Sequence, residues 1–94
     1  MKIPKRITTL YRGDINVIIT KDIAVNKYNW MSLSIDGAVI KINSYLSQEQ
    51  KERMLFIAIK KEVEDYLSDS HTKEYSNKAL DDMFFSTLKL NKLI

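Results

Sequence analysis

An amphipathic stretch from Gln48 to Leu67 constrains the fold of this chain more than any other part of its sequence. Its apolar residues recur at helical spacing and form one stripe, which comprises Leu55, Ile59, Val63 and Tyr66 and is widened by Met54, Ala58 and Leu67. The polar remainder is supplied largely by charged residues: Lys51, Glu52, Lys60, Lys61, Glu64 and Asp65. A stripe of this length must be covered by another element, so we expect the helix to pack across a β-sheet.

The boundaries of this helix and of a second one can be predicted from neighbouring residues. Ser47 and Gln50 fit a capping box, in which each side chain binds the backbone N–H of the other residue, so the first helix should begin at about Gln48. A polar connector follows, at residues 68–72. We expect the second helix from about Lys73 to Leu90. Its apolar face would consist of Ala79, Leu80, Met83, Phe84, Thr87 and Leu88.

The first half of the chain has the pattern of β-strands. Residues 6–11 and 14–20 are rich in Ile, Val and Thr and flank Gly13, which predicts a β-hairpin. Residues 21–30 are polar and mixed, and we expect a loop there. Residues 31–35 and 38–43 alternate around Asp36-Gly37, which predicts a second hairpin.

In the second hairpin, Ala38, Ile40 and Ile42 should face the core, because alternate side chains of a strand share one face. Two hairpins followed by two helices indicate an α+β fold, with a small antiparallel or mixed sheet packed by two C-terminal α-helices. At 94 residues we expect one domain spanning residues 1–94.

Composition excludes some classes of protein and chemistry. The chain has no cysteine, which removes disulfides and thiolate metal ligands and indicates a reducing compartment. The basic N-terminus is followed by no apolar core of a signal peptide, and no run of residues is long enough to cross a membrane. We therefore expect a soluble protein of the cytoplasm, without contact to a membrane.

Positive charge is concentrated near the N-terminus. Residues 1–29 carry six Lys or Arg against two Asp, whereas the whole chain carries a net charge of +3, so the remainder is slightly negative. These cations could contact nucleic-acid phosphates, with Tyr11, Tyr28 and Trp30 available for stacking on bases. No nucleic-acid-binding motif accompanies them, so a solvated charged face with core aromatics is favoured.

Motifs for catalysis are missing from the sequence. A zinc site needs three or four converging ligands, yet the chain has one histidine, His71, which lies in the polar connector. The carboxylates of Glu62 and Asp65 share a helical face, but such pairs are usually solvated surface. Two distant glycines cannot form a phosphate-binding loop. We therefore expect no metal and no cofactor.

Several segments along the chain together resemble small phage and prophage metallopeptidases of the ImmA/IrrE type. The segments are Met1-Lys2-Ile3-Pro4-Lys5-Arg6-Ile7, Ile40-Lys41-Ile42-Asn43, Leu46-Ser47-Gln48-Glu49-Gln50-Lys51-Glu52 and Leu88-Lys89-Leu90-Asn91-Lys92-Leu93-Ile94. The resemblance implies strands followed by a zinc-binding helix and a C-terminal helix. In that family the helix carries an H-E-x-x-H motif, in which the two histidines bind zinc and the glutamate is the general base.

This chain departs from the motif at every functional position. Phe56 stands at the first histidine, Ile57 at the glutamate and Lys60 at the second histidine, while Glu74 lies near the position of the third, acidic ligand. The resemblance therefore implies a pseudoenzyme. Phe56 and Ile57 could fill the former metal pocket with apolar atoms. Alternatively, they are ordinary core or interface residues of an unrelated α+β domain.

These observations predict a noncatalytic, phage- or prophage-type regulator or inhibitor that binds a host or phage protein in the host cytoplasm. A small basic nucleic-acid-binding accessory protein is the alternative, a divergent metal-dependent enzyme is a third hypothesis, and a homodimer stays open. Aromatic and arginine side chains dominate binding hot spots. The candidate partner-binding residues are Lys5, Arg6, Arg12, Tyr28, Trp30, Phe56 and Lys60.

Overall fold

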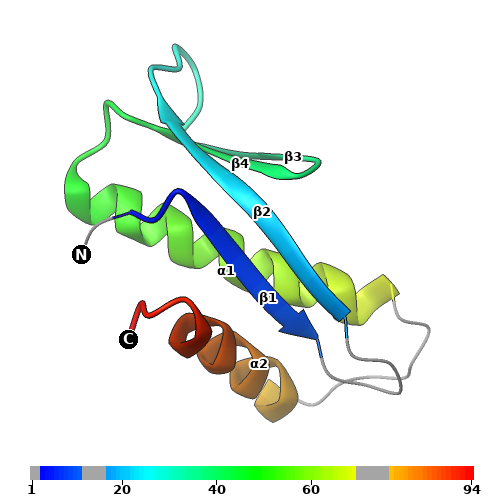
Figure 1. Ribbon diagram of the computed structural model, residues 1–94. Helices are drawn as coiled ribbons and strands as arrows, with labels where there is room; N and C mark the ends of the chain where they lie inside the picture. The colour runs from blue at the N-terminus through cyan, green and yellow to red at the C-terminus, as the bar shows by residue number, and fades with distance from the viewer. Residues whose placement is uncertain (1–2, 12–16, 70–76) are drawn as a thin grey trace. The chain divides into compact units, whose positions relative to one another are not determined.

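The computed structural model describes residues 3–11, 17–69 and 77–94 of the chain, and within this part the fold is α+β (Figure 1). Its elements are β1 (Arg6–Tyr11), β2 (Val17–Asn26), β3 (Leu33–Asp36), β4 (Val39–Asn43), α1 (Gln48–Asp69) and α2 (Asn77–Leu90). The strands form one sheet in the order β1-β2-β4-β3. Since β4 pairs in parallel with β2 and antiparallel with β3, the sheet is mixed, which confirms the predicted fold class.

The hairpin of β3 and β4 forms close to its predicted position. Asp36 pairs with Val39, so the two turn residues are Gly37 and Ala38 rather than Asp36 and Gly37. Gly37 has a φ of 59°, a conformation that costs glycine nothing because it lacks a Cβ atom. Ala38 lies in the turn and is exposed, so its predicted place in the core is wrong.

Strand β2 is longer at its C-terminal end than the sequence predicted. Residues 21–26, expected as a loop, belong to β2, and five of them pair in register with β4, from Asp22↔Val39 to Asn26↔Asn43. Ile23 is the one buried residue of this segment, whereas Val25, two positions on and on the same face, is 40% exposed. The predicted turn at Gly13 and the start of the second predicted strand lie outside the described residues.

The chain divides into two compact units, and strands β1 and β2 and helix α1 each contribute to both. Unit 1 comprises Met1–Ile7 and Thr20–Ala58, and unit 2 comprises Thr8–Ile19 and Ile59–Ile94. The buried apolar side chains of unit 1 come from the strands and from the first half of α1: Ile7, Ile23, Ile40, Ile42, Leu55 and Ala58. The predicted inward positions of Ile40 and Ile42 are confirmed.

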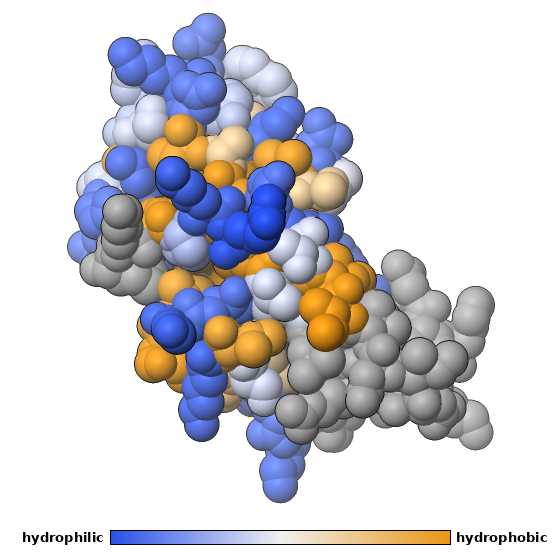
Figure 2. Space-filling model, in the orientation of Figure 1, coloured by the Kyte–Doolittle hydropathy of each residue, from blue (hydrophilic) through white to orange (hydrophobic). Residues whose placement is uncertain are grey.

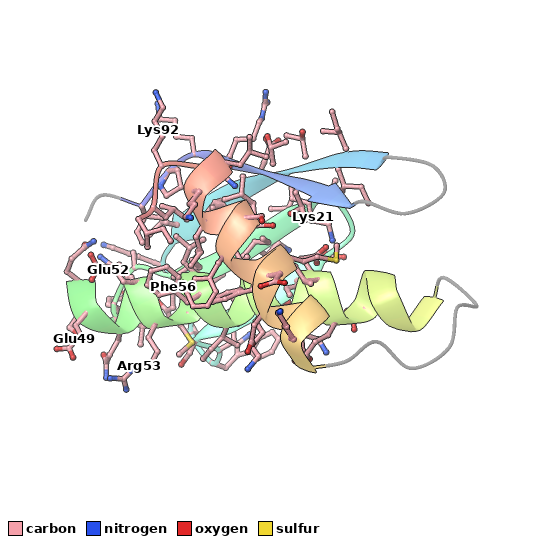
Figure 3. The ribbon with its side chains drawn as sticks, turned by 90° about the horizontal axis from the view of Figure 1, so that it is seen from below. Lys21, Glu49, Glu52, Arg53, Phe56 and Lys92 are labelled. Carbon is pink, nitrogen blue, oxygen red and sulfur yellow. The ribbon has the colours of Figure 1, made fainter. Side chains whose placement is uncertain are left out.

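Helix α1 begins with the predicted capping box. The Gln50 N–H donates to Ser47 Oγ and the Ser47 N–H donates to Gln50 Oε1, both at 3.2 Å. The apolar stripe is confirmed where it is described, since Leu55, Ile59 and Val63 are fully buried. Figure 3 shows that Glu49 and Arg53 point to one side of α1, and Glu52 and Phe56 to another. The members of each pair share a side because they are four residues apart.

Unit 2 is held by α2 and by the chain that follows it. Asn91 Nδ2 donates to Thr8 O and Thr87 O, both at 2.7 Å, and the Thr8 N–H donates to Asn91 Oδ1 at 2.8 Å. Of the predicted apolar face of α2, Thr87 and Leu88 are buried, whereas Leu80, Met83 and Phe84 are partly exposed. The described helix begins at Asn77, and residues 73–76 lie outside the described part.

Exposed apolar side chains occur in both units. Figure 2 shows apolar residues interrupted by hydrophilic ones on the face that it displays. The large apolar side chains with substantial exposure are Ile18, Val25, Trp30, Tyr45, Ile57, Phe85, Leu90 and Ile94. Among the described residues, no helix has the length and apolar character needed to cross a membrane.

Candidate protein-binding surface

Trp30 is the most exposed large apolar residue of the described chain, with 86% of its surface accessible. It lies in the connection of residues 27–32, which leads from β2 to β3 within unit 1. An indole in water gains nothing for the fold from its apolar area. The connection is nevertheless ordered by hydrogen bonds, most of which come from a single residue of β4.

That residue is Asn43, the last residue of β4, which is 8% exposed. Its Nδ2 group donates to Tyr28 O and to Met31 O, both at 2.7 Å, on either side of Trp30. Its Oδ1 atom accepts from the N–H of Tyr45 at 3.0 Å and, at 3.5 Å, from that of Tyr28. One buried amide therefore fixes the backbone that presents Trp30.

The backbone of Asn43 ties the same connection to the sheet. Its N–H donates to Ser32 O at 3.0 Å, and the next residue, Ser44, donates its N–H to Asn26 O at 2.8 Å. Both ends of the connection are thus held, at the end of β2 and at the start of β3. Because the buried polar groups are paired, this arrangement costs little despite the burial of an amide.

Tyr45 is a second exposed aromatic residue attached to Asn43, and sequence analysis missed it. It is 67% exposed, and its backbone N–H is held by Asn43 Oδ1. The available signal was its place directly after the strand, in Asn43-Ser44-Tyr45, where an Asn side chain binds the backbone two residues on. Tyr28, a predicted candidate, is partly buried.

A shallow groove of about 860 Å³ lies at the junction of β2 and the segment leading into β1, also within unit 1. Its lining residues are Ile3, Pro4, Lys5, Arg6, Asp22, Ile23, Ala24 and Val25. Arg6 Nε donates to Asp22 Oδ1 at 2.8 Å, with both side chains largely exposed. Such an exposed ion pair contributes about 0–1 kcal/mol.

The predicted candidate residues are only partly brought together. Lys5 and Arg6 line the groove, and Trp30 lies in the loop held by Asn43. Phe56 is partly buried on α1 in unit 1, whereas Lys60 is exposed on the part of α1 that belongs to unit 2. Arg12 lies outside the described residues.

The pocket-filling role considered for Ile57 is wrong. Ile57 is 46% exposed, whereas Leu55 and Ala58 on the same helix are buried. Ile57 is two positions from Leu55, a rotation of about 200° around the helix, which places it on the opposite side from the stripe. In the described part of the chain, no three His, Cys, Asp or Glu residues are grouped so that they could hold a metal ion. His71 and Glu74 lie outside that part.

No protein-family model, curated protein or solved structure matches this chain.

Proposed function

We propose that this chain is a noncatalytic protein-binding module, which regulates or inhibits a host or phage protein by occupying its surface. The observation that carries the proposal is the 86% exposure of Trp30 on a loop whose backbone is fixed by Asn43. Tryptophan is among the residues that contribute most at interfaces. A loop that is already ordered loses less conformational entropy on binding.

The proposal includes the resemblance to ImmA/IrrE-type metallopeptidases, with the chain as a scaffold that has lost its zinc ligands. Phe56, Ile57 and Lys60 offer apolar and cationic groups instead of ligands at the H-E-x-x-H positions. The exposure of Ile57 supports a contact surface rather than a filled pocket. A regulator of this type needs no bound metal for its activity.

Alanine substitutions of two exposed aromatic residues, one tryptophan and one phenylalanine, test the proposal. Tagged wild type, Trp30→Ala and Phe85→Ala are used to capture proteins from a bacterial lysate, and the captured proteins are identified by mass spectrometry. Phe85 is the matched control, since it is 52% exposed but lies on α2 in unit 2. We expect a partner that Trp30→Ala loses and Phe85→Ala keeps. Equal capture by all three proteins would reject the proposal.

Direct binding can then be measured without a label, because Trp30 is the only tryptophan of the chain. Titration with a tryptophan-free fragment of the captured partner should shift Trp30 emission to shorter wavelength as the indole leaves water. Self-association of this chain is tested by following Trp30 emission on dilution and by sedimentation. An emission spectrum that is unchanged at saturating partner would contradict a contact at Trp30.

The alternative function is nucleic-acid binding through the N-terminal cations. Lys5 and Lys27 are exposed and favour it, whereas Arg6 already binds Asp22. A mobility-shift assay at low salt distinguishes the two functions, because binding through phosphates weakens steeply as salt is added. Retention of DNA or RNA that depends on Lys5 and Lys27 and falls with salt would favour this alternative over protein binding.

A further inference from the structure

The C-terminal end of β2 presents backbone groups on two opposite sides. Toward β4, the Asp22 N–H donates to Ala38 O at 3.0 Å and Asn26 O accepts from the Ser44 N–H at 2.8 Å. Toward β1, the Ile23 N–H donates to Lys5 O at 2.8 Å. Since successive residues of a strand direct their N–H and C=O groups to alternate sides, those of Val25 point the same way as those of Ile23.

No described residue pairs with the backbone of Val25 on the side that faces the groove. Continued pairing in the register of Ile23 and Lys5 would bring Ile3 opposite Val25. Among the residues that the structure describes, none forms a hydrogen bond with the Val25 N–H or C=O on this side. Within the described residues, the Val25 N–H and C=O are therefore unpaired on the groove side, and Val25 is 40% exposed.

The charges around the groove favour an acidic ligand. Lys5 lines it and is exposed, and no carboxylate of the described residues forms an ion pair with it. Exposed Lys27 follows two positions after Val25. The one acidic residue in the lining, Asp22, is already neutralised by Arg6 at 2.8 Å. An incoming carboxylate would thus meet two cations and little repulsion.

We propose that this groove binds an extended acidic peptide segment of a partner protein, which adds as a short strand beside the end of β2. The Val25 N–H and C=O would pair with the peptide backbone, and Ile3 and Pro4 would contact its apolar side chains. Lys5 in the lining and Lys27, exposed beyond the end of β2, would pair with its carboxylates. Strand addition supplies affinity through the main chain and specificity through alternate side chains. The inference rests on the proposed protein-binding function and names the chemistry of the partner.

Fluorescence anisotropy with three labelled octapeptides tests the inference. The first alternates Glu with Val and Thr, the second has Lys in place of each Glu, and the third is the first with the central amides N-methylated. We expect the acidic peptide to bind about tenfold more tightly than either of the others, and its affinity to fall with salt. Equal affinities for the acidic and lysine peptides would overturn the inference.

Variants of the protein identify the site. Lys5→Glu should weaken the acidic peptide about tenfold, whereas Lys78→Glu, the same charge change at an exposed position of α2 in unit 2, should have little effect. Val25→Pro removes the open N–H but leaves the bonds of Asp22 and Asn26 to β4, and should weaken binding about fivefold relative to Val25→Ala. Circular dichroism checks that each variant folds.

The outcomes separate this inference from the proposed function. If Lys5→Glu and Lys78→Glu bind the acidic peptide equally, the groove is not its site and the inference is overturned. If Val25→Pro does not fold, the N-methylated peptide decides, because it removes the same backbone pairing from the ligand. If the wild type still captures a partner through Trp30 but binds none of the peptides, the groove inference alone is overturned. If neither Trp30-dependent capture nor peptide binding is observed, the proposed function is overturned as well.

Discussion

Replacing Asn43 with alanine should destabilise the protein more than replacing any comparable surface amide. The substitution removes three short hydrogen bonds, to Tyr28 O and Met31 O at 2.7 Å and from the Tyr45 N–H at 3.0 Å. Each such bond contributes about 0.5–1.5 kcal/mol net. We therefore expect a loss of about 2–4 kcal/mol in the free energy of unfolding, a large fraction of the usual 5–15 kcal/mol.

Asn26→Ala is the matched control for this substitution. Asn26 is also an asparagine at the end of a strand, but its side chain is exposed and accepts one local bond, from the Lys27 N–H at 2.9 Å. The expected loss is about 0.5–1 kcal/mol. The difference between the two variants measures what the buried amide contributes, because residue type and size of the change are the same.

Urea denaturation followed by circular dichroism measures both losses. With a slope of about 2 kcal/mol per molar urea, Asn43→Ala should lower the midpoint by about 1–2 M and Asn26→Ala by at most about 0.5 M. Acrylamide quenching of Trp30 in the folded variants reports separately on the loop. Equal midpoints for Asn43→Ala and Asn26→Ala would refute the claim that Asn43 organises this part of the protein.

Three further substitutions test the packing. Leu55→Ala should lower stability by about 2–5 kcal/mol in urea denaturation, since Leu55 is fully buried, whereas Ile57→Ala should cost under about 1 kcal/mol because Ile57 is 46% exposed; similar losses would contradict the assigned helix face. Ser47→Ala removes the helix cap and should cost about 1 kcal/mol by the same assay. Thr87→Val should leave the melting temperature unchanged or raise it, because Thr87 Oγ1 is buried without a hydrogen-bond partner among the described residues, and a clear drop would reveal an unrecognised partner.

Local patterns predicted the parts of the fold that depend on neighbouring residues. The capping box of Ser47 and Gln50 and the turn at Gly37 are local, and both were recognised from sequence within one residue. The extension of β2 through residues 21–26 was missed because it depends on a distant strand, β4. With only Ile23 buried in that segment, its own residues indicate a strand weakly.

The candidate surface was predicted in part. Trp30 was chosen as a contact for its chemistry, and its 86% exposure agrees with that choice, although its role in binding stays a prediction. The favoured interpretation of Trp30 as a core aromatic is wrong, because the indole lies on a loop and not on a buried strand or helix face. Asn43 and Tyr45 were missed, because a polar residue at the end of a strand gives no sign that it is buried and bonded to a loop more than ten residues away. The open edge of Val25 follows from pairing register, which single residues do not encode.

The position of β4 between β2 and β3 has a consequence for the order in which the protein folds. Hairpin pairs between β3 and β4 join residues three to nine positions apart, whereas each parallel pair between β2 and β4 spans 17 positions. Closing the shorter loops costs less entropy, so the hairpin should form first and dock on β2 later. The bonds of Asn43 to Tyr28 and Met31 span 15 and 12 positions, fewer than the 17 of the β2–β4 pairs, so the Trp30 connection should become ordered after the hairpin and before β2 docks.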